Sequence, residues 1–305
     1  MSRRSPREDP RAQEDSLPAQ GAESSIGAKF SKGAELSKGA GLSKGVGPGE
    51  NAVSSQGGLP RYARGELASE LGILPLPDPS PEVGVLVERS SSGVLEVRLL
   101  GERAPGAVSV DFRSADFARR ASEGKRGLLG RAVGLAKGEK PLVWDATAGL
   151  GRDAVRLAWM GARVVAFERD RIVRALLADG LTRGMIGEDP LAEAIESRFE
   201  LRAGDAREFF DPLKVDEPPD VIYLDPMFPE RGSALAKKEA QILGVLCGKG
   251  SDREEDAALF EGAEKLAPKR IVVKRPRYAP TLIEGREPAH RFEGKSVRYD
   301  LYLPQ

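Results

Sequence analysis

Residues 142–154 read LVWDATAGLGRDA. Leu142–Asp145 opens with three apolar residues and is expected to form a buried strand. In the turn that follows, Gly149 and Gly151 let a ligand approach the backbone, because no Cβ stands in the way. A helix is expected next, over Arg152–Met160. This strand, turn and helix predict one unit of a parallel sheet that binds a ligand at the turn.

Strands and helices alternate from Pro141 onward, which predicts an α/β fold whose mostly parallel sheet is covered by helices on both faces. The expected strands are Leu142–Asp145, Arg163–Glu168, Phe199–Arg202, Val221–Asp225, Arg270–Lys274 and Val297–Leu303. The expected helices are Arg152–Met160, Ile172–Arg183, Ala234–Leu246 and Asp252–Leu266.

A smaller unit is expected before this sheet. Val83–Glu88, Val94–Leu99 and Ala107–Phe112 are short β-rich runs separated by turn residues, which predicts a small antiparallel sheet. Arg126–Ala136 has the apolar spacing of a helix.

Residues 1–58 are rich in Gly, Ser, Lys and Ala, and a hexamer beginning Ser-Lys-Gly recurs at residues 31, 37 and 43. One apolar residue per hexamer cannot offset the entropy lost on ordering, so this tail is expected to be disordered. The predicted organisation is therefore a tail over 1–58, an N-terminal α+β unit over 59–125 and a main domain over 126–305.

Composition excludes several classes of protein. Lys plus Arg and Asp plus Glu each total 47, so any contact with nucleic acid must come from local patches. A single cysteine and a single histidine, Cys247 and His290, leave no Cys/His zinc cluster, and no metal is expected. Neither an apolar run of roughly 18 residues nor a signal-peptide core is present, which indicates a cytoplasmic protein without a membrane partner.

Two carboxylates follow the next strands and suggest an adenosyl ligand. Glu168 ends the second strand of the main sheet, where it can accept hydrogen bonds from both hydroxyls of a ribose. Asp205 follows the third strand and is placed to receive an adenine amine. The spacing Gly149-x-Gly151-x-x-Ala154 also fits a relaxed dinucleotide fingerprint, so a nucleotide-dependent oxidoreductase remains an alternative at this point.

The fourth strand favours methyl transfer to an amine. It ends in Asp225-Pro226-Met227-Phe228, which resembles the Asp/Asn-Pro-Pro-aromatic motif of amino-methyltransferases. An exocyclic amine on a purine is a poor nucleophile because its lone pair is delocalised into the ring. Asp225 can accept an N–H hydrogen bond and orient the amine, Pro226 stiffens the turn, and Phe228 can stack on an extruded base. A strand-terminating turn is the plain structural alternative for Asp-Pro.

Longer motifs resemble one family. DATAGLGRDA (145–154), FERD (167–170), ALLADGLTRG (175–184), VIYLDPMFP (221–229), SALAKKE (233–239) and KRIVVKRPRYAP (269–280) are similar to the ribosomal RNA small subunit methyltransferase J family. The resemblance covers roughly residues 75–303. It implies a class I methyltransferase domain, S-adenosylmethionine as cofactor, and N2-methylation of a guanine in 16S ribosomal RNA. The cofactor contacts that it implies fall on Arg152, Asp153, Glu168, Arg169, Asp205, Ala206 and Asp225.

Basic residues near the expected strand ends suggest the RNA contacts. Lys237 and Lys238 follow the catalytic turn, and Lys274 and Arg275 end the fifth strand. Phosphate contact is expected there, and most firmly for Lys274 and Arg275. For the helix lysines a solvated face competes equally.

The chemistry of the fourth strand serves any conjugated amine, so adenine N6 in RNA or DNA is the nearest rival substrate. An RNA-binding module without catalysis is a further alternative, against which the cofactor carboxylates argue. The partner expected from the resemblance is 16S ribosomal RNA or the small ribosomal subunit.

Overall fold

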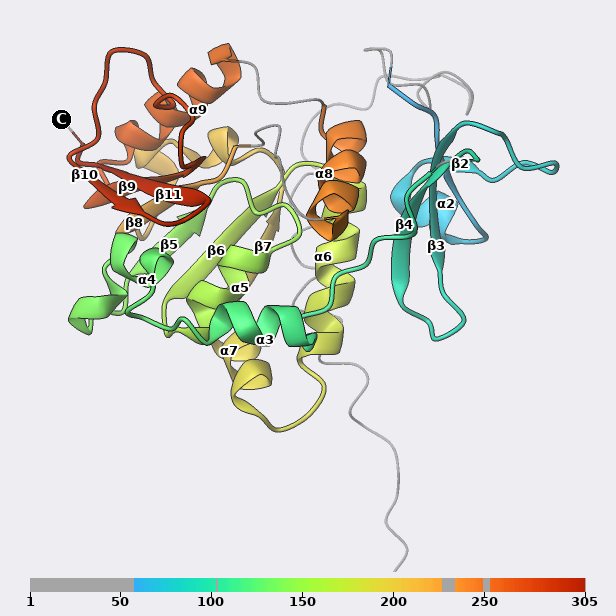
Figure 1. Cartoon of the computed structure of the whole chain (residues 1–305), viewed down its shortest axis with the longest axis horizontal. Coiled ribbons are helices and arrows are strands. Elements are labelled where there is room, and N and C mark those ends of the chain that lie inside the picture. Colours follow the sequence, from blue (N-terminus) through green and yellow to red (C-terminus); the bar gives the residue numbers. More distant parts are fainter. Residues whose placement is uncertain (1–57, 103, 227–233, 249–252, 305) are drawn as a thin grey trace, which may run out of the picture.

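The computed structural model describes residues 58–102, 104–226, 234–248 and 253–304, with backbone only for 234–237. Two sheets lie side by side with helices between them (Figure 1). The predicted disordered tail lies outside the described residues, apart from Gly58. The division into units 59–125 and 126–305 stays a prediction.

The smaller sheet is mixed rather than antiparallel. Its strand order is β2-β1-β3-β4, and β1 pairs in parallel with both β2 and β3, while β3 and β4 are antiparallel. The predicted runs do pair antiparallel, whereas β1 and β2 were missed; they make the sheet mixed, because the short helix α2 connects them and returns the chain in the same direction. The segment expected as a third strand, 107–112, makes only a bridge between Val108 and Val97. The elements are β1 (Arg61–Ala63), α2 (Leu67–Leu71), β2 (Leu74–Pro75), β3 (Gly84–Arg89) and β4 (Leu95–Leu100).

The larger sheet has the strand order β10-β11-β9-β8-β5-β6-β7. The five strands from β9 to β7 are parallel, and β11 is antiparallel to both of its neighbours. All six predicted strands are present, and β10 was missed. The bounds are β5 (Leu142–Asp145), β6 (Arg163–Glu168), β7 (Phe199–Ala203), β8 (Val221–Leu224), β9 (Arg270–Pro276), β10 (His290–Glu293) and β11 (Val297–Tyr302).

The four helices predicted after the glycine turn are present, but the segment 126–136 departs from its prediction, and α2, α3 and α7 were missed. The segment Arg126–Ala136 is not one helix, because Gly134 has a positive φ of 94° and separates α4 from a short 3-10 turn. Helix α7 was missed, although Asp189 accepts hydrogen bonds from two backbone N–H groups at its start and Pro190 occupies its first turn. None of the helices in the described segments has the length and apolar character that a membrane crossing needs. The bounds are α3 (Ala115–Ala121), α4 (Leu128–Ala132), η2 (Leu135–Lys137), α5 (Arg152–Trp159), α6 (Arg171–Gly184), α7 (Pro190–Arg198), η3 (Ala206–Phe209), η4 (Pro212–Lys214), α8 (Ala234–Leu246) and α9 (Arg253–Lys265).

Side chains of the central strands alternate between two apolar layers. Val143 and Tyr223 belong to the layer that includes α5 and α6, whereas Trp144 and Ile222 belong to the layer that includes α9. Each of these residues is at most 3% exposed. Burying an aliphatic or aromatic side chain of this size contributes roughly 1.5–3 kcal/mol, so both faces of the sheet stabilise the fold.

The topology fixes where a ligand can bind. From β5 the chain proceeds through β6 to β7 on one side, and β8 and β9 then lie on the other side. Ligands of open α/β sheets bind outside the carboxyl ends of the strands where the strand order reverses, which here is between β5 and β8. The predicted glycine turn follows β5, and the Asp-Pro motif follows β8.

Candidate active site

The glycine turn after β5 has the conformation that the sequence predicts. Gly149 and Gly151 have φ values of 54° and 73°, a region that residues with a side chain rarely adopt. A Cβ on Gly151 would lie 2.3 Å from Cδ1 of Leu177, so the turn and α6 pack without room for a methyl group. A Cβ on Gly149 would have no atom closer than 3.9 Å, so this side of the turn faces open space.

Glu168, at the end of β6, is a buried carboxylate beside this turn. It is 7% exposed and accepts hydrogen bonds from the backbone N–H of Gly149 (2.9 Å) and of Asp170 (2.7 Å). Burial raises the pKa of Glu168 to about 7. Two carboxylate oxygens offer about four acceptor positions, so the two backbone contacts leave capacity for a ligand's hydroxyl groups.

The segment after β7 lies next to Glu168. Asp205 caps η3 and accepts from Arg207, with 2.6 Å between its Oδ2 and an Nη atom. Burial alone would raise the pKa of Asp205, but the hydrogen bonds from Arg207 outweigh it and the pKa is lowered. Arg169 forms ion pairs with Asp205 (3.6 Å) and with Glu255 of α9 (3.3 Å). Ala206 is buried and forms part of the apolar floor.

These elements enclose a cavity of about 350 Å³, within the range of small-molecule sites. The cavity runs along the carboxyl ends of β7, β6, β5 and β8, as the reversal of strand order predicts. Its wall includes Gly149, Arg152, Asp153, Glu168, Arg169, Asp205, Ala206, Asp225 and Pro226, and also Arg120, Asp145, Thr147, Tyr223, Glu239, Asp256 and Lys274.

Asp225 is held at this cavity from two sides. Its backbone N–H donates to Oγ1 of Thr147 (2.6 Å), which ties the end of β8 to the glycine turn. Its Oδ2 accepts from Nζ of Lys274 (2.8 Å). The side chain of Lys274 is 20% exposed, so it lies in the wall of the cavity rather than on the outer surface.

Lys274 also pairs with Asp153, which belongs to a buried polar network. Oδ2 of Asp153 accepts from Lys274 Nζ (2.9 Å) and from the hydroxyl of Tyr223 (2.7 Å), while Oδ1 accepts from Arg156 (2.8 Å). Burial opposes the charge of Asp153, but the Lys274 and Arg156 cations outweigh it and lower its pKa far below the usual range. Burial likewise opposes the charge of Lys274, and Asp153 with Asp225 raises its pKa well above the ordinary value.

Two of the predicted RNA contacts need correction. Arg275 is 4% exposed and its Nε donates to the carbonyl of Pro280, so its guanidinium faces the interior and is not presented to an RNA strand. Lys274 is engaged by two carboxylates. Side chains alternate along a strand, but a strand covered on both faces buries both sets, and the sequence reasoning overlooked this. Lys238 is half-buried on α8. The side chain of Lys237, and all of Phe228, lie outside the described residues.

The sequence analysis also missed an acid in the cavity wall. Asp145, at the end of β5, is 2% exposed, and its Oδ1 accepts from the N–H of Thr147 (3.1 Å). Burial raises the pKa of Asp145 to about 8, so the side chain is mostly protonated at neutral pH. An acidic residue directly before a glycine turn was the available signal.

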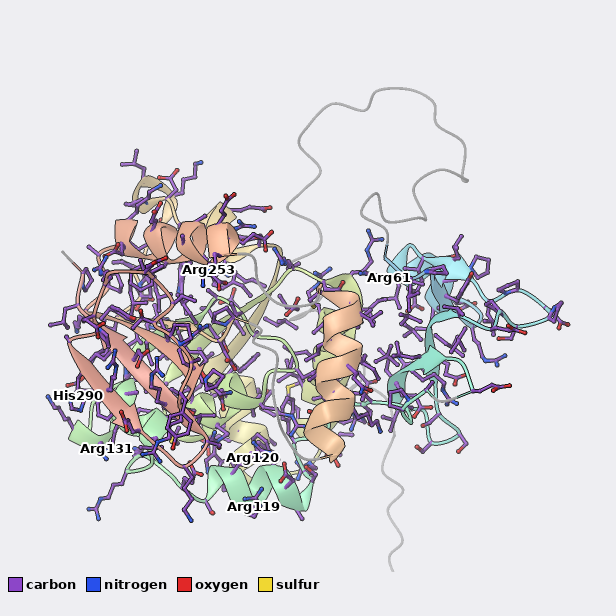
Figure 2. All side chains as sticks on the ribbon, turned by 45° about the horizontal axis from the view of Figure 1, so that its top comes forward. Arg61, Arg119, Arg120, Arg131, Arg253 and His290 are labelled. Atoms are coloured by element: carbon purple, nitrogen blue, oxygen red, sulfur yellow. The ribbon has the colours of Figure 1, made fainter. Side chains whose placement is uncertain are left out.

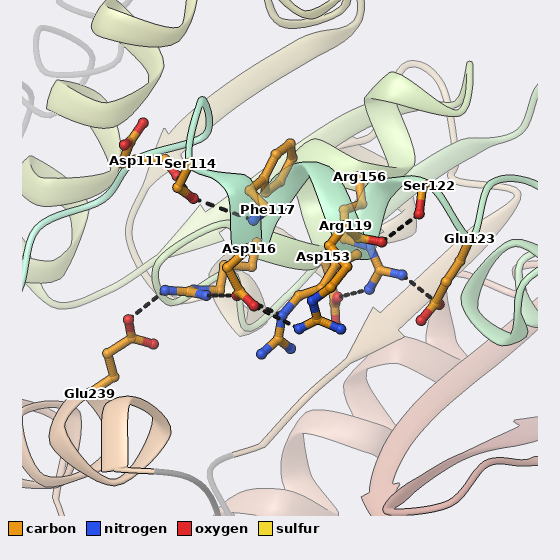
Figure 3. A network of polar contacts seen from close by, with 12 residues as sticks. Asp111, Ser114, Asp116, Phe117, Arg119, Ser122, Glu123, Asp153, Arg156 and Glu239 are labelled. Atoms are coloured by element: carbon orange, nitrogen blue, oxygen red, sulfur yellow. Dashed lines mark hydrogen bonds and ion pairs between the residues drawn. The ribbon is translucent and has the colours of Figure 1, made fainter.

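A second polar network lies where α3, α5 and α8 meet (Figure 3). Asp116 of α3 accepts from Arg119 (2.7 Å) and Arg120 (2.9 Å), and one Nη of Arg152 lies 3.5 Å away. The other Nη of Arg152 pairs with Glu239 of α8. The predicted cofactor residue Arg152 is thus at the cavity, tied to two acids that the sequence analysis had not singled out.

The residues present fit a nucleoside with a zwitterionic tail. Glu168 supplies a buried acceptor for a ribose, and Gly149 leaves the backbone accessible beside it. Arg152, Glu239 and Asp225 supply charges of both signs farther along the same cavity. This donor set matches S-adenosylmethionine.

Comparison with known proteins agrees with this chemistry. A family described as "Putative SAM-dependent methyltransferase" matches residues 74–304. The chain belongs to this family. S-adenosylmethionine is therefore the cofactor of this methyltransferase, and the class I fold expected from the sequence is confirmed.

Curated relatives are similar over nearly their whole length. The methyltransferase is 43% identical to the ribosomal RNA small subunit methyltransferase J of Stutzerimonas stutzeri, over 78% of this chain and 89% of that protein. It is also 43% identical to the protein of that name from Dechloromonas aromatica, over 80% and 96%. A crystal structure of the SAM-dependent methyltransferase of Neisseria gonorrhoeae matches with a TM-score of 0.61 and 33% identity, over 80% of this chain and 95% of that one.

Proposed function

We propose that this methyltransferase methylates the exocyclic N2 amine of a guanine in 16S ribosomal RNA of the small ribosomal subunit. The observation that carries the proposal is the Asp225-Pro226 turn, which opens into the cofactor cavity in a chain similar to ribosomal RNA small subunit methyltransferases J. The family membership argues against the oxidoreductase alternative, for which the Asp-Pro turn has no role.

In the proposed cofactor site, residues at the carboxyl ends of β5, β6 and β7 contact successive parts of the cofactor. Gly149 lets the cofactor approach the backbone, whereas Gly151, predicted for the same role, lets the turn pack against Leu177 of α6. Glu168 accepts from the ribose hydroxyls, and Asp205 with Ala206 shapes the adenine end. Arg152, Asp153, Arg169 and Asp225 complete the proposed set; Asp153 acts through Lys274 rather than by direct contact. The bound cofactor supplies a methyl group on a sulfonium sulfur, which is a strong electrophile at neutral pH.

Asp225 is the proposed catalytic residue, and its contact with Lys274 defines what it does. A carboxylate 2.8 Å from an ammonium is a weak base, so Asp225 orients the amine by accepting its N–H rather than by removing a proton. Orientation is the main requirement for such a displacement and can contribute roughly 7–11 kcal/mol. The amine proton becomes acidic once the methyl group is transferred and leaves to water. Pro226 fixes the turn; Phe228 remains a proposed stacking residue.

Fewer residues are now proposed to contact the RNA. Lys237 and Lys238 of α8 remain proposed phosphate contacts, while Lys274 is reassigned to the cavity wall and Arg275 to the interior. Lys274 becomes a positioning residue for Asp225.

The product of the reaction tests the proposal. We expect labelled S-adenosylmethionine and small subunits lacking the modification to give N2-methylguanosine at one site, as read by nucleoside mass spectrometry. The subunit should exceed short duplexes as a substrate, because extruding a paired guanine costs a few kcal/mol. The Asp225→Ala variant, which retains the cavity, serves as the matched control and should give no label.

Other outcomes are distinguishable. Label in N6-methyladenosine would keep the chemistry and replace the substrate, and label in no nucleoside despite demonstrated cofactor binding would refute the ribosomal RNA substrate.

A further inference from the structure

Arg120 is a cation in the wall of the cofactor cavity for which the sequence analysis had no role. It belongs to α3, which packs against α5, the helix that starts at the glycine turn. The side chain is 46% exposed, and its Nε donates to Oδ2 of Asp116 (2.9 Å). The Nη groups of Arg120 donate to no acceptor among the described residues. A guanidinium so fixed presents its remaining donors as a pair.

The strand order defines the two ends of the cavity. Asp205 and Glu168 follow β7 and β6, and these positions suit the adenine and the ribose. Arg152 begins α5, after the next strand, β5, and Arg120 reaches the same network through Asp116. Neighbouring strands are about 4.8 Å apart, so a cofactor whose ribose lies at β6 extends its methionine portion toward Arg152 and Arg120.

The charges at this end of the cavity match that portion. Its α-carboxylate and α-ammonium groups require a cation and an anion close together. Arg120 and Arg152 supply cationic groups, and Glu239, 15% exposed and paired with Arg152, supplies the anion. The N-terminus of α5 adds backbone N–H groups that favour a carboxylate.

We propose that Arg120 binds the α-carboxylate of the methionine portion of S-adenosylmethionine. Asp116 positions the guanidinium, and Arg152 stands beside it as the link to Glu239. The inference rests on the proposed cofactor cavity and is independent of which RNA is methylated. The competing occupant is a phosphate of the RNA substrate, because the side chain of Arg120 lines the cavity and is also 46% exposed.

Arg119 provides a matched control on the same helix. It pairs with the same carboxylate as Arg120 but is 70% exposed and does not line the cavity. Figure 2 shows both arginines on α3. The variants Arg120→Ala, Arg120→Lys and Arg119→Ala of the full chain therefore separate a contact inside the cavity from a general change in surface charge.

The test is calorimetric titration with S-adenosylhomocysteine and with methylthioadenosine, which lacks the amino-acid portion. Arg120→Ala should raise the Kd of S-adenosylhomocysteine about 10- to 100-fold, as expected for loss of a charge-assisted hydrogen bond. Its Kd for methylthioadenosine should stay within about twofold of wild type, and Arg120→Lys should restore part of the loss. Arg119→Ala should change neither Kd.

Three results would overturn the inference. Wild-type affinity of Arg120→Ala for S-adenosylhomocysteine, with weakened RNA binding, would assign Arg120 to a phosphate. An equal loss for both ligands would mean a distorted cavity rather than a lost carboxylate contact. Failure of the wild-type protein to bind S-adenosylhomocysteine would remove the cavity assignment itself. A negative result in the ribosomal RNA assay leaves these titrations interpretable, so the two proposals fail separately.

Discussion

Replacing Glu168 by Gln should make the cofactor-free protein more stable, relative to wild type, as the pH rises. Burial raises the pKa of Glu168 from 4.5 to about 7. A carboxyl with a raised pKa contributes stability at low pH that is lost between its unfolded and folded pKa values. With these two values, wild type loses about 2.5 kcal/mol between pH 5 and pH 8.5 through this group alone. Gln does not titrate and escapes that loss.

Glu168→Gln also lowers the free energy of unfolding by an amount that does not depend on pH, and comparing two pH values removes this amount. Glu168 accepts from the N–H of both Gly149 and Asp170, and the amide of Gln can accept only through its oxygen. One lost backbone hydrogen bond costs about 1 kcal/mol at every pH. The informative quantity is therefore the change with pH in the difference of unfolding free energy between variant and wild type.

Urea denaturation of both proteins without cofactor, at pH 5 and pH 8.5, measures this quantity. We expect the difference to shift toward the variant by about 2–3 kcal/mol at the higher pH. Glu261→Gln, at an exposed position of α9, is the control for the same chemical change made at the surface. The same difference at both pH values for Glu168→Gln would refute the raised pKa.

Cofactor binding should respond in the opposite direction. Glu168→Gln should bind S-adenosylhomocysteine about 10- to 100-fold more weakly at pH 8.5, because a charge-assisted contact with the ribose is lost. Wild-type affinity should fall as the pH drops below about 7, since the carboxylate must then lose a proton on binding. A buried carboxylate that lowers the stability of the cofactor-free protein but raises its affinity for the ligand is expected where the carboxylate contacts that ligand.

Three further substitutions test the lysine in the cavity wall and the glycine turn. Lys274→Met removes the cation between Asp153 and Asp225. We expect the free energy of unfolding to fall by roughly 3 kcal/mol and kcat to fall about 100-fold or more, while the salt dependence of RNA binding stays unchanged. A salt slope shallower by about one would show instead that Lys274 contacts a phosphate. Gly151→Ala places a Cβ 2.3 Å from Leu177 at a φ of 73° and should cost about 1–3 kcal/mol in unfolding experiments. Gly149→Ala, with a positive φ but open space, should cost less, and equal losses would contradict the clash.

The sequence predicted the centre of the sheet well because two signals coincide there. In Leu142–Asp145 and Arg163–Glu168 a run of buried apolar residues ends in an acid, so the apolar pattern and the residue at the strand end agree. At the edges of the sheet these two signals do not coincide. His290–Glu293 in β10 is largely exposed and carries no apolar alternation, and its identity as a strand comes from pairing with β11.

The residues of the candidate site also fall into those that the sequence could predict and those that it could not. The residues that follow strand ends were predictable, because the carboxyl ends of parallel strands meet at one edge of a sheet. Arg120 was not, since its proximity comes from the packing of α3 against α5 rather than from a motif. The role of Lys274 was misjudged because charge in a sequence does not reveal whether two acids from other elements will surround it. The partners of a buried charge are a tertiary property.

The position of β11 has a consequence for the order of assembly. β11 follows β10 in the chain but lies between β10 and β9, and Tyr299 of β11 stands opposite Lys274. Among the described strands β11 is the neighbour of β10, so the two are expected to join the sheet together as a preformed hairpin. Until this hairpin docks, the outer edge of β9 is exposed to water, and water competes with Asp225 for the ammonium group of Lys274. Docking of the hairpin therefore shields Lys274, and we expect a molecule with an undocked hairpin to orient Asp225 less firmly.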